Sequence, residues 1–168
     1  MISSSSKTSK QKTLHNKIIF SGIGLHSGKY ASVKIEGDLP NSGITFVRTD
    51  IEKNNQVKAL WSNVSSTVLS TTISNKQGVS ISTIEHLMSA LSGMHIDNAK
   101  IFISGPEVPI MDGSSKPFVE LIEKARIVEQ DANRKLLKVK KEVKVENNDS
   151  FAKVVPHEDF SIDFEIEF

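Results

Sequence analysis

The chain has 168 residues, 38% of them hydrophobic, and a formal net charge of +1; this suits a soluble globular protein and argues against a nucleic-acid partner. Cysteine is absent, which excludes disulfides and thiolate metal sites and leaves histidine and carboxylates as the available metal ligands. Because no apolar run is long enough to span a membrane and the N-terminus has no apolar signal core, we expect a cytoplasmic protein without a stable membrane anchor.

The first part of the chain predicts short strands joined by turns. Residues 1–12 are rich in serine and lysine and are expected to form a disordered tail. An apolar run at residues 18–20 then leads into three closely spaced glycines. A dinucleotide-binding motif would need a helix after the glycines, but a strand pattern follows, so a glycine-rich turn between two strands is favoured. His26 lies in this turn, either as an exposed turn residue or as a site residue.

Further strands are expected on both sides of a hairpin turn at residues 75–78, where Asn and Gly favour a tight reversal. These strands are residues 30–35, 44–48, 57–61, 67–73 and 79–81.

A short helix is predicted from Ser82 to Gly93. Ser82 followed three residues later by Glu85 fits a capping box, and Gly93 fits the left-handed residue after a helix end. Apolar residues recur at helical spacing and form one buried stripe, namely Ile84, Leu87, Met88 and Leu91. Glu85 lies on the flank of this stripe and His86 points roughly opposite it, so a carboxylate and an imidazole are available for a function. Taken alone, the cap explains Glu85 and solvation explains His86.

A strand at residues 98–104 follows, and then a loop at residues 105–115 that is rich in proline and glycine. We expect Ser114 or Ser115 to cap a second helix with Pro117 in its first turn. Its apolar stripe is Phe118, Leu121, Ile122 and Ala125. The pattern predicts an α+β fold class, with a two-layer domain of mostly antiparallel sheet and two helices over residues 13–130.

The remainder of the chain predicts only strands. Residues 131–135 resemble a polar linker, and strands are expected at 136–145, 151–155 and 160–168. The last of these alternates perfectly, with five apolar residues on one face. Strands without a covering helix make a poor independent unit. We therefore interpret residues 136–168 as the incomplete start of a second domain.

Several motifs occur in a characteristic order: Gly22–Gly28, Gly43–Asp50, Ser82–Leu87, Gly93–Asn98, Gly105–Ser114 and Asp159–Phe164. Together they resemble the zinc-dependent UDP-3-O-acyl-N-acetylglucosamine deacetylases of lipid A biosynthesis, in their N-terminal part only. The resemblance implies two similar α+β domains with the active site between them. It also implies a second domain, missing here, that supplies a His-Lys-x-x-Asp motif and a further catalytic histidine.

The resemblance implies that Glu85 is the general base and that His86 is a ligand of Zn²⁺. It also implies that His26, Leu69, Ser70 and Thr71 lie beside the substrate, a UDP-linked acylated glucosamine, although the chemistry of His26 is not assigned. The implied reaction is hydrolysis of the acetamide of UDP-3-O-acyl-N-acetylglucosamine to UDP-3-O-acyl-glucosamine and acetate, an early committed step of lipid A biosynthesis. Lacking the second-domain ligands, the chain is expected to be inactive alone.

Two other classes stay open on the residues. One is a truncated, non-catalytic module; the other is an S5-like α+β binding domain, against which the near-neutral charge counts. Asp112, in a tight Asp-Gly turn, is expected to hold its loop rather than to perform chemistry.

Overall fold

A five-stranded sheet forms the centre of the first of two units in the computed structural model, which describes residues 9–166. The chain divides after Arg134, and each unit is described by itself. In sheet order the strands are β2 (Ile18–Ile23), β3 (Tyr30–Gly37), β9 (Ala99–Ile103), β4 (Ile44–Arg48) and β5 (Gln56–Lys58). All neighbouring pairs are antiparallel except β4 and β9, which confirms the predicted, mostly antiparallel sheet.

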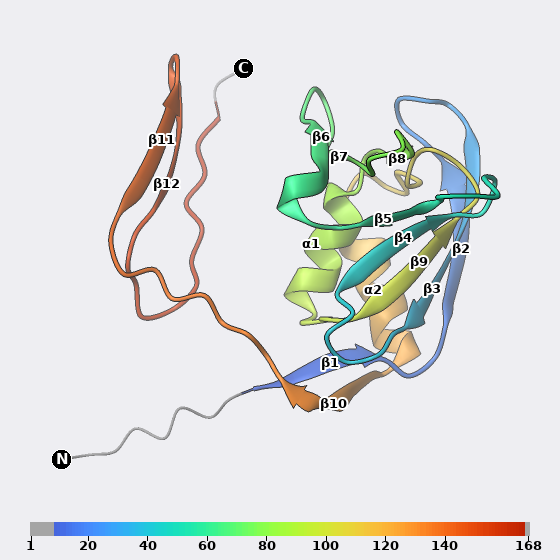
Figure 1. The fold of residues 1–168 in the computed structure, drawn as a ribbon, viewed down its shortest axis with the longest axis horizontal. Coiled ribbons are helices and arrows are strands. Elements are labelled where there is room, and N and C mark those ends of the chain that lie inside the picture. Colours follow the sequence, from blue (N-terminus) through green and yellow to red (C-terminus); the bar gives the residue numbers. More distant parts are fainter. Residues whose placement is uncertain (1–8, 167–168) are drawn as a thin grey trace. The chain divides into compact units, whose positions relative to one another are not determined.

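Two helices, α1 (Glu85–Gly93) and α2 (Lys116–Ala125), pack against each other and cover one face of this sheet (Figure 1). The core lies between the two layers, and its largest fully buried side chains include Ile35, Phe46, Leu87, Ile101 and Phe118. Phe118 meets Phe20 edge to face, with 5.4 Å between the ring centroids. Each such buried side chain contributes about 1.5–3 kcal/mol to folding. The predicted two-layer α+β architecture is confirmed.

The helix α2 follows its sequence pattern closely. Phe118, Ile122 and Ala125 are buried, and Leu121 packs against the core. Pro117 stands in the first turn, where the absence of its N–H costs no hydrogen bond. Ser115 is the residue that precedes the helix, but the Oγ of Ser114 accepts the hydrogen bond from the N–H of Lys116, at 3.2 Å.

The start of α1 differs from the prediction. The helix begins at Glu85, Ile84 precedes it, and no side chain caps it, so the predicted capping box is wrong. Ser82 instead forms a parallel bridge with Glu107: its N–H donates to Pro106 O and its carbonyl accepts from Val108 N–H. The extended backbone that this bridge requires places the serine too early to cap the helix.

The end of α1 also differs. Gly93 is the last helical residue, and His95, with φ 58°, takes the left-handed conformation that we expected of the glycine. The N–H of Ile96 donates to Leu91 O at 2.8 Å, and the N–H of His95 donates to Ser92 O at 3.0 Å. This pair of hydrogen bonds is a Schellman motif, which closes the helix two residues later than predicted.

A small second sheet, in the order β6-β7-β8, lies beside the start of α1 (Figure 1). It consists of β6 (Val64–Ser66), β7 (Thr72–Ser74) and β8 (Ser80–Ile81), preceded by the 3₁₀ helix η1 (Trp61–Asn63). The strands predicted at 57–61 and 67–73 are therefore largely wrong. Leu69 has φ 59°, which interrupts the extended conformation. The predicted hairpin turn is confirmed by the bond from Gly78 N–H to Asn75 O, at 3.0 Å.

An antiparallel ribbon pairs β1 (Lys10–Leu14) with β10 (Ile127–Asn133). Residues 10–12 therefore form a strand rather than a disordered tail, and residues 131–133 form a strand rather than a linker; residues 1–8 lie outside the described residues. Polar side chains hold the ribbon, because Asn98 Nδ2 donates to Gln11 Oε1 at 2.8 Å and to Gln130 Oε1 at 2.7 Å. Because these contacts join polar side chains that are far apart in the sequence, no hydrophobic periodicity predicts them.

The second unit contains one hairpin, β11 (Val143–Asn147) paired with β12 (Ser150–Val154). Residues 136–142 and 155 are outside strands, and residues 160–166 form no strand, so the predicted terminal strand is wrong over its described length; Phe168 lies outside the described residues. Phe160 is 90% exposed and Phe164 is 82% exposed.

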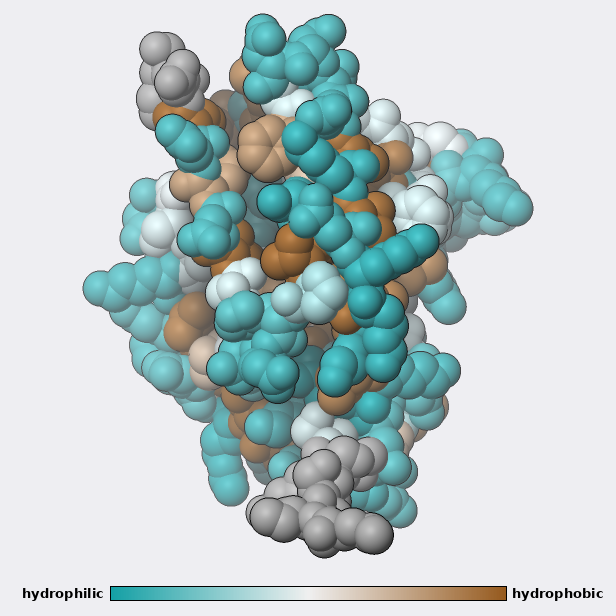
Figure 2. All heavy atoms as spheres, turned by 90° about the vertical axis from the view of Figure 1, so that its left-hand side faces the viewer, coloured by the Kyte–Doolittle hydropathy of each residue, from teal (hydrophilic) through white to brown (hydrophobic). Residues whose placement is uncertain are grey.

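Hydrophobic side chains stand among hydrophilic ones on the face drawn in Figure 2. None of the helices found in residues 9–166 is long and apolar enough to cross a membrane.

Candidate active site

Glu85 opens α1 and contacts the chain at Thr71. Its Oε2 accepts a hydrogen bond from the N–H of Thr71 at 3.0 Å, and the carbonyl of Thr71 accepts the N–H of Ile84 at 3.3 Å. The loop between β6 and β7 is thus bound to the start of the helix through both backbone groups of one residue. Within the described part of the chain Oε1 receives no hydrogen bond, so one carboxylate oxygen is available to a ligand.

Glu85 and His86 are both half-buried, in agreement with their predicted place off the apolar stripe. Leu87, the next residue, is fully buried in the core. A rigid, core-anchored helix therefore presents a carboxylate and an imidazole at consecutive positions. The carboxylate can accept a proton, and an imidazole nitrogen can donate its lone pair to an electrophile or a metal ion.

The residues Leu69, Ser70 and Thr71 form the loop that meets the helix. Leu69 is 84% exposed with a positive φ, whereas Ser70 and Thr71 are half-buried. An exposed leucine two residues from the atom that binds Glu85 gives the loop an apolar tip. The structure thus brings Thr71 and Glu85 into contact, as a shared site requires.

His26 lies in the turn that joins β2 to β3, and it is exposed. The turn is closed by hydrogen bonds from Gly24 N–H to Lys29 O at 2.9 Å and from Gly28 N–H to Gly24 O at 3.0 Å. The predicted turn between two strands is confirmed. The backbone N–H of His26 donates to Glu107 Oε1 at 3.0 Å, so this turn is also bound to the loop after β9.

Glu107 is the polar residue that the sequence analysis missed. Its side chain is buried and accepts three hydrogen bonds: from the N–H of His26, from the N–H of Ser27 at 2.7 Å, and from the hydroxyl of Thr83 at 2.8 Å. Burial by itself raises the pKa of Glu107, but the hydrogen bonds from His26, Ser27 and Thr83 outweigh it and lower the pKa to about 2. An acidic residue between two prolines in an otherwise apolar segment was the available signal.

The glycine at position 24 is explained by this carboxylate. A Cβ at Gly24 would lie 2.3 Å from Glu107 Oε2 and 2.6 Å from Ser27 Oγ. No side chain fits at that distance without displacing the buried carboxylate. The glycine-rich turn therefore serves a close approach between protein groups, which agrees with the rejection of a dinucleotide-binding motif.

Other sequence-predicted groups lie outside this arrangement. Asp112 Oδ1 accepts hydrogen bonds from Ser114 N–H at 2.9 Å and from Ser114 Oγ at 2.8 Å, which confirms that it holds its loop. In residues 9–166 no three His, Asp or Glu side chains gather closely enough to hold a metal ion. His86 therefore belongs to no such group of three in this part of the chain.

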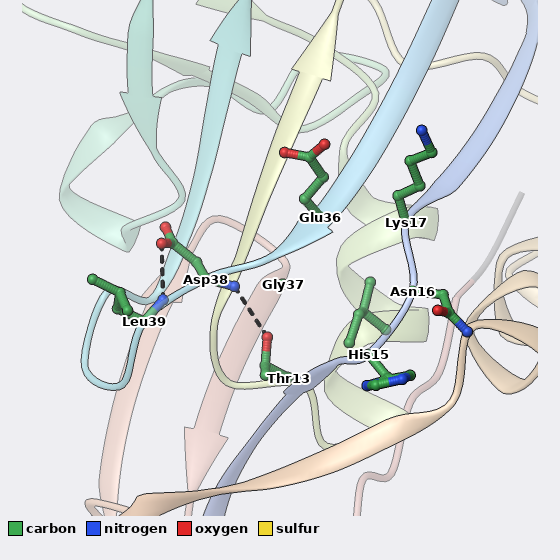
Figure 3. Close-up of a pocket in the computed structure, with 9 residues that line it drawn as sticks. Thr13, His15, Asn16, Lys17, Glu36, Gly37, Asp38 and Leu39 are labelled. Atoms are coloured by element: carbon green, nitrogen blue, oxygen red, sulfur yellow. Dashed lines mark hydrogen bonds between the residues drawn. The ribbon is translucent and has the colours of Figure 1, made fainter.

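A surface hollow at the end of β1 contains none of the predicted site residues (Figure 3). Residues 13–17 and 36–39 line it, with Lys17, Glu36 and Asp38 among them. In Figure 3 the side chains of Lys17 and Glu36 extend away from the hydrogen bond between Asp38 N–H and Thr13 Oγ1, which is 3.1 Å long. The hollow is open to solvent.

The family profile and the individual relatives that match the chain all belong to one family of deacetylases. The profile of UDP-3-O-acyl N-acetylglycosamine deacetylase matches residues 11–168. Proteins named UDP-3-O-acyl-N-acetylglucosamine deacetylase are similar to the chain over 95% of its length: it is 45% identical to that of Methylococcus capsulatus, 43% to that of Haemophilus influenzae and 46% to that of Hahella chejuensis. The matches cover 52% of each relative, so the chain spans about half the length of these curated proteins.

Proposed function

Since this chain belongs to the UDP-3-O-acyl N-acetylglycosamine deacetylase family, we propose that it supplies one side of an active site that hydrolyses the acetamide of UDP-3-O-acyl-N-acetylglucosamine. The relatives that carry this activity in their names are about twice as long as the matched region. The proposal therefore concerns the part of the site that residues 9–166 provide, and it includes a cytoplasmic location for the reaction.

The contact between Glu85 and Thr71 carries the proposal. A general base must be held in a defined orientation and must keep an oxygen available to the proton it removes. Glu85 meets both requirements, because Oε2 is bound by Thr71 N–H at 3.0 Å and no described residue donates to Oε1. We also propose that the adjoining Leu69–Thr71 loop contacts the substrate and that His26, in the turn between β2 and β3, binds it.

In the proposed reaction the oxygen of a water molecule attacks the carbonyl carbon of the acetyl group while Glu85 accepts the proton that the water loses. The bond between that carbon and the amide nitrogen then breaks. The acetyl group leaves as acetic acid and ionises to acetate, and the nitrogen takes the proton that Glu85 carries to become the amine of UDP-3-O-acyl-glucosamine. General base catalysis of this kind contributes about 10²–10⁴-fold to a rate.

Zinc is proposed as the metal of the complete enzyme on the strength of the family resemblance, with His86 as a ligand. A catalytic zinc site needs three protein ligands, and residues 9–166 contain no group of three. Residues 9–166 therefore do not complete a zinc site by themselves. We propose that the remaining ligands belong to the part of the relatives that the chain does not span.

A chimera tests the proposal. The chain is fused in frame to the second half of the Methylococcus capsulatus relative, and deacetylation of UDP-3-O-acyl-N-acetylglucosamine is assayed with added Zn²⁺. We expect activity in the fusion, a loss of kcat of about 10²-fold or more in Glu85→Gln, and a loss of bound zinc in His86→Ala. The matched control is Glu52→Gln, an exposed glutamate in the loop after β4. A Glu85→Gln fusion with unchanged kcat would refute the role given to this carboxylate.

A further inference from the structure

One buried carboxylate connects a turn to the start of a helix that lies far away in the sequence. Oε1 of Glu107 is shared by the N–H of His26 and the hydroxyl of Thr83, at 3.0 and 2.8 Å, and Oε2 accepts the N–H of Ser27 at 2.7 Å. The first donor belongs to the turn between β2 and β3, and the second precedes α1 by two residues. The N–H of His26 and the hydroxyl of Thr83 therefore donate to the same oxygen atom.

The surroundings leave this carboxylate little freedom. The backbone on either side of Glu107 is paired with Ser82, because Ser82 N–H donates to Pro106 O and Val108 N–H donates to Ser82 O. Gly24 approaches so closely that a methyl group there would collide with Oε2. Thr83 has φ 55°, a conformation that β-branched residues rarely adopt, and its hydroxyl points at the carboxylate. The strained residue is held where the hydrogen bond needs it.

Only an ionised carboxylate fits this set of partners. All three groups around Glu107 act as donors, and a carboxylate accepts at both oxygens. A glutamine of the same shape would place its NH₂ group against the N–H of His26 or the N–H of Ser27, and that N–H would lose its acceptor. Hydrogen bonds to a buried charge are also the stronger kind.

We propose that Glu107 is a positioning residue that couples the His26 turn to the start of α1 and so sets the geometry between His26 and the Glu85–His86 pair. The catalytic meaning of this coupling rests on the proposed function, whereas the coupling itself does not. Glu107 does not reach the site: its side chain is buried and it acts through Thr83 and the His26 backbone. It would fix how the substrate-binding turn faces the base.

A double-mutant cycle on the 168-residue chain tests the coupling, read out by backbone amide NMR. The variants are Glu107→Ala, Thr83→Val and their combination, with Glu52→Ala as the matched control. Thr83→Val keeps the β-branched shape and removes only the hydroxyl. Because Thr83 and His26 share Oε1, the single variant should shift the His26 amide resonance. In the Glu107→Ala background, which lacks the shared oxygen, the same change should leave that resonance unmoved.

In Glu107→Ala we also expect the His26 and Ser27 amide protons to exchange with solvent about 10- to 100-fold faster, since each loses a hydrogen bond to a charged group. If this variant does not fold, Thr83→Val decides alone. A His26 shift supports the coupling, and its absence overturns it, as does an equal shift in both backgrounds. These measurements need no zinc or substrate, so their failure is distinct from a failure of the deacetylase assay.

Discussion

The stability of the first unit should fall in acid because of Glu107. Its pKa is about 2 in the folded protein, whereas the ordinary value is 4.5. A group whose pKa is lower in the folded state stabilises that state above its unfolded pKa, and this contribution is lost as the pH falls through the folded pKa. At 1.36 kcal/mol per pH unit, the contribution is about 3 kcal/mol at neutral pH, and about 2 kcal/mol of it disappears by pH 3.

Urea unfolding of wild type and Glu107→Gln at pH 7 and pH 3 measures this contribution. Other carboxylates with a lowered pKa, Asp50, Asp112 and Asp131, are present in both proteins, so their effects cancel in the difference. The wild type should lose about 2 kcal/mol more than Glu107→Gln between the two pH values. Equal losses in the two proteins would show that Glu107 is not held ionised in the folded state, and the reasoning would fail.

Three further outcomes are expected. Gly24→Ala should destabilise the chain by about 1–3 kcal/mol in urea unfolding, because its methyl group meets the buried carboxylate, whereas Gly93→Ala, with open space around it, should be neutral or stabilising. Zinc titration of the chain alone should show no tight stoichiometric site that disappears in His86→Ala; a tight site would mean that ligands have been missed. Hydrogen exchange should be slow at Ile101–Ile103 and fast at residues 160–166; equal protection in a monomer would contradict this.

The predictions from sequence succeeded where a residue's neighbours in the fold are dictated by periodicity. The apolar stripe of α2 and the strand β3 follow from spacing alone, because the core selects apolar side chains at fixed intervals. The predicted position of Glu85 and His86, outside the apolar stripe of α1, also follows from helical spacing. Their assignment as base and metal ligand stays a prediction.

The errors arose where a distant contact overrides a local rule. Ser82 had the spacing of a cap, but its backbone is bound to the loop around Glu107. Residues 10–12 of β1 were predicted to be a tail because their partners, Asn98 and β10, lie far along the chain. Glu107 was missed for the same reason, since its donors come from two other segments. No local pattern in the sequence records such contacts.

The ribbon of β1 and β10 joins the two ends of the first unit. Lys12 faces Glu129 and Leu14 faces Ile127, so the chain enters the unit and leaves it side by side. The pairing of β1 with β10 thus links the beginning of the unit to its end. Truncation before Thr13 would remove most of β1, the pairing partner of β10, whereas truncation after Arg134 would leave both strands in place. Because the first and last strands of the unit are adjacent, the unit is suited to insertion into another protein or to circular permutation.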